Sequence, residues 1–165
     1  MKAVLMSIRP KWVQLIERGE KTTEVRKTAP LLKTPLKVFI YCSRGRDRLL
    51  TIMRDGEMNY GEIYHGKPVF ITIPEEGTQR PRRMVIGEFT CNAIFEYNMS
   101  PAGIVLLSRS SCLTEKEILK YAAGRPSLYG WKISDCRWYR DWKNLSDFGL
   151  TRPPQSWQYV EVPDA

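Results

Sequence analysis

The chain has 165 residues, of which 42% are hydrophobic and 11% aromatic, and it carries a formal net charge of +8. This length and composition favour one folded domain with its own core, and they exclude an intrinsically disordered chain. No apolar run approaches the roughly 18 residues that a membrane-spanning helix needs, so we expect no membrane partner. The N-terminal segment lacks a cleavage site of small residues, which predicts a cytoplasmic protein with reduced cysteines.

The four cysteines do not form any C-x-x-C pair, and the single histidine is His65. Structural zinc sites usually combine closely spaced pairs of such ligands. We therefore expect neither a metal nor another cofactor. The surplus of basic residues would attract a phosphate-rich partner, although a generic basic surface would have the same composition.

The first quarter of the chain alternates short strands with one helix. Apolar residues 2–8 predict a strand, and Pro10 is well placed to open a short amphipathic helix. Gly19 is a natural end for that helix. Residues 22–26 then fit a strand by alternation, and residues 37–43 form an apolar run typical of a buried strand.

The remainder begins with a long irregular excursion at about residues 44–83, which contains one clear strand at 68–73. A capping box, Thr114 with Glu117, predicts the start of a helix within residues 111–124. Further strands are expected at 84–97, 128–139 and 156–162. Short strands with two to three packed helices predict an α+β fold, in which residues 1–165 form a single domain on a small, mostly antiparallel β-barrel.

The segment GEKTTEVRK, residues 19–27, concentrates charge beside the first helix. On a strand, Thr22, Glu24 and Arg26 share one face, and Lys21 lies in the preceding turn. One interpretation is an exposed ion pair worth about 0–1 kcal/mol. The other is a polar cleft, in which Glu24 accepts a hydrogen bond from a base or hydroxyl and the cations engage phosphate.

These residues also carry a family resemblance. Gly19, Lys21, Glu24 and Arg26 spell G-x-K-x-x-E-x-R. Together with residues 7–27 and the later segments KVFIYCS, VIGEF, LYGW and RPPQSWQYVE, this pattern resembles the ASCH family of the PUA-like superfamily, in particular a bacterial and phage-associated subgroup. The resemblance implies a PUA-like β-barrel with a cleft beside the first helix, and a role in binding RNA or nucleotide-like ligands.

The resemblance also leaves an enzymatic role open. One branch of the family removes the acetyl group of acetylcytidine with a threonine placed three residues after the motif lysine, and another is reported to cut single-stranded RNA. Here that position is Glu24, and Thr23 would point to the opposite face. A metal-independent hydrolase acting on a modified nucleoside or on single-stranded RNA would therefore use Glu24 as base and Lys21 to polarise a carbonyl. A protein-interaction module is a third, weaker interpretation.

Several further residues are candidates for the same cleft. Ser7 and Arg9 flank the start of the first helix, where they could cap the helix or hold an anion. The aromatic candidates could stack on bases or simply fill the core. Two basic clusters, Arg44, Arg46, Arg48 and Arg54, and Arg80, Arg82 and Arg83, would form a phosphate track if they share a face. The full set of expected ligand-binding residues is Ser7, Arg9, Lys21, Glu24, Arg26, Tyr41, Ser43, Arg44, Tyr129, Trp131, Arg152 and Gln155.

Overall fold

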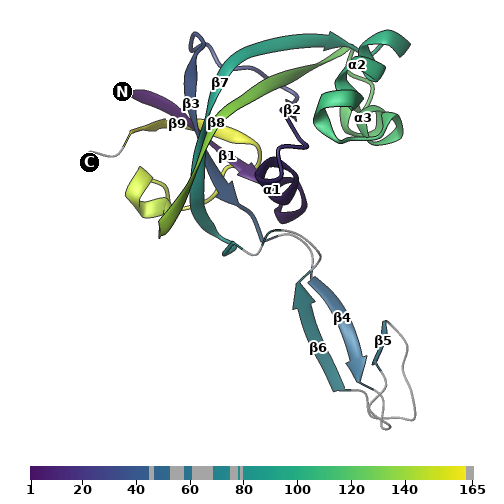
Figure 1. Ribbon diagram of the computed structural model, residues 1–165, viewed down its shortest axis with the longest axis vertical. Coiled ribbons are helices and arrows are strands. Elements are labelled where there is room, and N and C mark those ends of the chain that lie inside the picture. The colour runs from purple at the N-terminus through teal and green to yellow at the C-terminus, as the bar shows by residue number, and fades with distance from the viewer. Residues whose placement is uncertain (45–46, 53–57, 61–68, 75–77, 79, 163–165) are drawn as a thin grey trace.

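The computed structural model describes residues 1–44, 47–52, 58–60, 69–74, 78 and 80–162. Its main sheet is built from β1 (Lys2–Ile8), β2 (Thr23–Arg26), β3 (Leu36–Cys42), β7 (Met84–Asn98), β8 (Ser127–Lys143) and β9 (Trp157–Glu161). The spatial order is β2-β8-β7-β3-β1-β9 (Figure 1). Strand β1 lies between two neighbours and is buried on both faces, which explains its unbroken apolar sequence.

The predicted α+β class is confirmed, but two details of the predicted barrel are wrong. The sheet is mixed, because β1 and β3 pair in parallel across a crossover that contains the first helix and β2. The sheet is also not closed, because β2 and β9 remain at opposite ends of the strand order. Alternation within a segment identifies strands, but it does not say which strands become neighbours.

Side chains join the two unpaired edges of this sheet. The Trp157 indole at the start of β9 donates to Thr28 Oγ1 just beyond β2, at 3.1 Å. The Arg26 guanidinium at the end of β2 lies 3.4 Å from the hydroxyl of Ser156. We call the unpaired boundary between β2 and β9 the seam. The rings of Trp131 and Trp157 pack beside it, with their centroids 5.5 Å apart. The sheet is therefore curved enough for side chains of its two edge strands to contact each other, although the backbones of these strands do not pair.

In the described part of the chain, three α-helices pack against this curved sheet: α1 (Pro10–Glu17), α2 (Pro101–Ser111) and α3 (Glu115–Ala122), and a short 3₁₀ helix, η1 (Leu145–Phe148), precedes β9. The capping box of α3 is confirmed, with Thr114 Oγ1 accepting from the Glu117 N–H at 3.1 Å. Helix α2 was not predicted, although its start carries a Ser-Pro signal. Ser100 Oγ accepts from the backbone of Gly103 at 3.2 Å, and proline occupies the first turn. Helices α2 and α3 lie together at one end of β7 and β8 (Figure 1).

Within the predicted excursion, β4 (Asp47–Ile52), β5 (Met58–Tyr60) and β6 (Val69–Pro74) form a separate antiparallel sheet in the order β5-β4-β6. Figure 1 shows this second sheet projecting away from the main sheet. The predicted strand at 68–73 corresponds to β6.

The return from this sheet is attached to α1. Glu17 accepts from Thr78 Oγ1 at 2.7 Å and also pairs with Arg80. The backbone N–H of Thr78 donates to the Pro10 carbonyl at 3.2 Å. Among the described residues, no helix is long and apolar enough to cross a membrane.

Candidate functional site: a cavity beside the first helix

A cavity of about 680 Å³ lies beside α1, where β1, β2, β3 and the segment before β9 converge. It brings together residues that are far apart in the chain. Nine of the twelve expected ligand-binding residues line it, namely Ser7, Arg9, Lys21, Glu24, Arg26, Tyr41, Ser43, Arg44 and Gln155. The charged segment after the first helix therefore faces a concavity.

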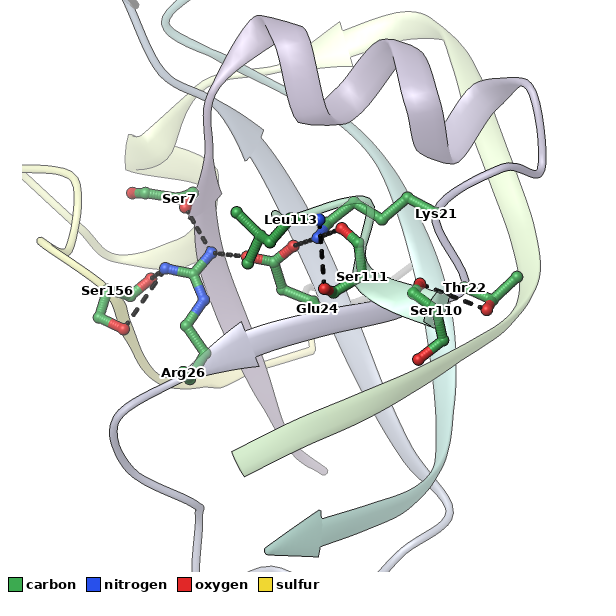
Figure 2. Close-up of polar contacts among 9 residues, drawn as sticks. All are labelled: Ser7, Lys21, Thr22, Glu24, Arg26, Ser110, Ser111, Leu113 and Ser156. Atoms are coloured by element: carbon green, nitrogen blue, oxygen red, sulfur yellow. Dashed lines mark hydrogen bonds and ion pairs between the residues drawn. The ribbon is translucent and has the colours of Figure 1, made fainter. Parts of the chain in front are cut away.

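A buried network of Lys21, Glu24 and Arg26 forms one wall of the cavity (Figure 2). Arg26 Nη2 lies 2.8 Å from Glu24 Oε1, and Lys21 Nζ lies 3.3 Å from Glu24 Oε2. The three residues are only 2%, 6% and 7% exposed, in chain order. This arrangement is not the exposed surface pair that one interpretation of the sequence allowed.

The two cations of this network are also anchored to the backbone of other elements. Lys21 Nζ donates to the Ser111 carbonyl at the end of α2, at 2.7 Å. Arg26 Nη2 donates to the Ser7 carbonyl of β1 at 2.9 Å, and Nη1 lies 3.5 Å from the Ser156 carbonyl. The network thus ties α2, β1 and the segment before β9 to β2. Figure 2 shows Glu24 between the two cations, with Ser7 and Ser156 beside Arg26 and with Ser111 beside the Lys21 ammonium.

The side chains of Thr23 and Val25, which alternate with Glu24 and Arg26 along β2, are packed inside the protein. Thr23 Oγ1 accepts from Lys132 Nζ at 3.0 Å, and Val25 packs in the apolar cluster beneath α2 and α3. Alternation along β2 therefore places the Val25 side chain in that apolar cluster, although Val25 also contributes to the cavity lining between Glu24 and Arg26.

Glu24 has little capacity left for other partners. Its Oε2 is shielded from solvent and makes no hydrogen bond of good geometry within the described structure, although the Lys21 ammonium lies close enough for an ion pair. The Nε atom of Arg26 is likewise buried without a hydrogen-bond partner among the described residues. The carboxylate acts mainly as a counter-ion that holds two cations in place.

Aromatic rings contribute further walls of the cavity. Trp12 of α1 and Tyr121 of α3 both line it and are half-buried. Burial raises the pKa of Tyr121, and the nearby Arg26 only partly offsets that effect, so the phenol stays neutral at physiological pH. Sequence reasoning missed both rings as site residues, because each falls on the apolar stripe of its helix and no other signal marks it.

Arginines surround the mouth of the cavity. Arg9, Arg44 and Arg83 line it and are exposed. Arg9 precedes α1, whereas Arg44 and Arg83 lie where the chain leaves and re-enters the main sheet. Of the predicted phosphate track, Arg44 and Arg83 thus line the cavity, whereas Arg80 pairs with Glu17 of α1. Arg46, Arg54 and the side chain of Arg48 lie outside the described part of the structure.

Three expected residues lie away from this cavity. Trp131 is completely buried in the main core, so neither face of its indole is available to a base. Tyr129 lines a second, more open cavity beside the loop that follows β2. Arg152 is exposed but does not line the first cavity.

The described part of the chain contains no cluster of three or more histidine, cysteine, aspartate or glutamate side chains that could hold a metal ion. His65 lies outside the described residues. The four cysteines are free thiols.

No family model matches this sequence, and no curated protein matches it. Solved structures do. The ASCH protein of Zymomonas mobilis is 20% identical with a TM-score of 0.65, over 96% of this chain and 87% of that chain. A serine-to-alanine variant of that protein matches at 19% identity and a TM-score of 0.62, over 96% and 88%. A tyrosine-to-phenylalanine variant matches at 20% and 0.63, over 98% and 91%. The resemblance drawn from the sequence is therefore confirmed as a shared fold: the chain has the fold of an ASCH protein along nearly its whole length.

Proposed function

We propose that this chain binds RNA or a nucleotide-like ligand, and that it takes one nucleotide unit into the cavity beside α1. The observation that carries the proposal is the composition of that cavity. It combines a buried ion-pair wall, aromatic side chains and a mouth lined by arginines.

The charge of the cavity favours an anionic ligand. Its lining includes Arg9, Lys21, Arg26, Arg44 and Arg83, whereas Glu24 is the acidic residue among the described lining residues. Because Lys21 and Arg26 share that carboxylate, Arg9 and Arg83 at the mouth contribute most of the positive charge that the described structure leaves uncompensated. A phosphate-bearing ligand would be attracted from solution by this charge, and the attraction would weaken with added salt.

The size of the cavity favours a compact group over a long stretch of polymer. Pockets for small ligands typically measure about 300–1,000 Å³, and this one is about 680 Å³. The rings of Trp12 and Tyr121 would provide apolar contact area for a base. A single nucleotide, either free or displaced from a strand, fits these features.

The geometry supports binding better than hydrolysis. A general base must reach the proton of its water or hydroxyl. Glu24 Oε2 is shielded from solvent, and Oε1 is held by Arg26. Lys21 is already engaged with Ser111 and Glu24. The pair would need rearrangement before it could act in catalysis.

Fluorescence anisotropy with labelled single-stranded RNA tests this proposal. The logarithm of the affinity should fall linearly with the logarithm of salt concentration, with a slope of about −0.7 per phosphate contact. Arg9→Gln should weaken binding and make that slope shallower by about 0.7 if Arg9 contacts phosphate. Arg18→Gln is the matched control, because Arg18 is also exposed and flanks the other end of α1, but lies outside the cavity lining.

Absence of RNA binding, or an affinity that does not change with salt concentration, would contradict the proposal. The hydrolase is tested separately by incubation with acetylcytidine and with labelled RNA in EDTA. Product that forms with the unaltered chain and disappears in Lys21→Ala would favour the enzyme.

A further inference from the structure

We propose that the mouth of the cavity at the end of β3 is an anion subsite, formed by Tyr41, Ser43 and Arg83, that holds the phosphate of the bound nucleotide. This inference rests on the proposed function and adds to it the ligand's orientation. The phosphate would lie at this end, and the base would extend toward Trp12 and Tyr121.

Tyr41 is the first reason for placing an anion here. The residue is only 5% exposed and lines the cavity, yet its hydroxyl makes no hydrogen bond to any residue that the structure describes. The hydroxyl oxygen itself is not among the solvent-shielded atoms, so it can reach a ligand in the cavity. Burial raises the pKa of Tyr41, with the nearby Arg83 opposing this only in part, so the hydroxyl keeps its proton and can donate it to an anion.

Arg83 is the second reason. Its backbone lies in the left-handed region, with φ of 63°, and its N–H donates to the Cys42 carbonyl at 2.6 Å. This conformation costs a non-glycine residue about 1 kcal/mol, and such strain concentrates at functional sites. The side chain lines the cavity and has no ion-pair partner among the described residues. Its guanidinium is close enough to Tyr41 to affect the pKa of that phenol, and it is available to an anion.

Ser43 completes the group. Its backbone N–H is fixed by the Ile8 carbonyl at 2.9 Å, and its half-buried side chain lines the same end of the cavity. A hydroxyl, a phenol and a guanidinium are typical donors to phosphate oxygens.

The ion-pair wall is a poorer place for the phosphate. The ammonium of Lys21 is engaged by the Ser111 carbonyl and Glu24, and the guanidinium of Arg26 by Glu24 and Ser7. A phosphate there would have to compete with the Glu24 carboxylate. At the mouth, Tyr41 and Arg83 gain partners without losing any.

Isothermal titration with cytidine 5′-monophosphate, cytidine and inorganic phosphate tests the subsite. Arg83→Gly removes the guanidinium while accepting the left-handed backbone, so thermal stability should be unchanged or higher. It should weaken binding of the monophosphate about 10–100-fold and that of cytidine less than about twofold. Tyr41→Phe should weaken the monophosphate about 3–10-fold with the same selectivity. Arg152→Gln, which removes a charge outside the cavity lining, should leave both affinities within about twofold.

Inorganic phosphate, the third probe, tests whether the subsite recognises the phosphate group by itself. Inorganic phosphate that competes with the monophosphate, but not with cytidine, would identify the phosphate group itself as the recognised element. Equal losses for cytidine and its monophosphate, or an unchanged monophosphate affinity in both Arg83→Gly and Tyr41→Phe, would overturn the subsite and leave the cavity as a nucleotide site. If the unaltered chain binds neither cytidine, nor its monophosphate, nor RNA, the proposed function fails and the subsite fails with it.

Discussion

Replacement of Glu24 by glutamine is the most direct test of how the cavity wall is held together. The substitution preserves the size and shape of the side chain and removes only its negative charge. Lys21 and Arg26, which are 2% and 7% exposed, would then share a buried site without a counter-ion. The glutamine carbonyl can still accept one hydrogen bond from Arg26, so the packing is retained and the electrostatic loss dominates.

The expected cost follows from this burial. Removing one partner of a buried ion pair typically destabilises a protein by about 3–5 kcal/mol, because the remaining charge is left uncompensated. Two cations depend on Glu24, at 2.8 Å and 3.3 Å, whereas the retained hydrogen bond offsets part of the loss. We therefore expect a loss of about 3 kcal/mol, which is a large part of the 5–15 kcal/mol by which domains are usually stable.

Urea denaturation followed by tryptophan fluorescence measures this loss. The matched control is Glu161→Gln, because Glu161 pairs with the N-terminal ammonium at 3.2 Å but both groups are largely exposed. Glu161→Gln should lower the free energy of unfolding by less than about 1 kcal/mol. A loss of similar size for Glu24→Gln and Glu161→Gln would refute the view that the wall is a buried electrostatic unit.

Three other variants test separate features of the fold by the same denaturation assay. Gly130→Ala should destabilise the chain by about 1–3 kcal/mol, because a Cβ there would lie 2.6 Å from the Tyr97 ring; an unchanged midpoint would contradict this close approach. Thr114→Ala should cost about 0.5–2 kcal/mol by removing the N-cap of α3, and no loss would mean that the cap is dispensable. Burial raises the pKa of Cys42 and Cys91 from 9.0 to about 11, so their contribution to stability is present below pH 9 and lost as pH rises toward 11. The double variant Cys42→Ala, Cys91→Ala should therefore lose stability less steeply over that window, and equal slopes would argue against buried thiols as the cause.

Local sequence patterns predicted most elements of the main sheet. The apolar run at 2–8 and the buried run at 37–43 correspond to β1 and β3 almost residue for residue. The capping box correctly marked the start of α3. In each case the signal is a short-range preference for one periodicity or one cap, which does not depend on distant residues.

The features that could not be predicted depend on contacts between distant segments. The parallel pairing of β1 with β3 and the open seam between β2 and β9 are both properties of strand order. Helix α2 was missed because its apolar residues lack a clear stripe, although Ser100 marks its start. Tyr121 could not be predicted as a site residue for a similar reason. A residue on the apolar stripe of a helix can line either the core or a cavity, and only the packing of distant segments decides which.

The spacing of the charged motif has a physical explanation in this arrangement. Gly19 adopts a φ of 72° after α1, and the backbone N–H of Lys21 then bonds to the Leu15 carbonyl at 3.1 Å, which turns the chain back toward β2. Glu24 follows three residues later on the cavity face of β2, and Arg26 follows two residues after that on the same face.

Because β2 does not pair with β9, the Arg26 guanidinium can reach across the open seam to the segment before β9. A closed barrel would place backbone hydrogen bonds along that seam. The same opening that leaves the sheet incomplete therefore leaves the concavity accessible, and the motif both spans the seam and forms the cavity wall. A substitution that breaks this wall should thus change the shape of the cavity as well as its charge, which is why stability and ligand affinity need to be measured on the same variants.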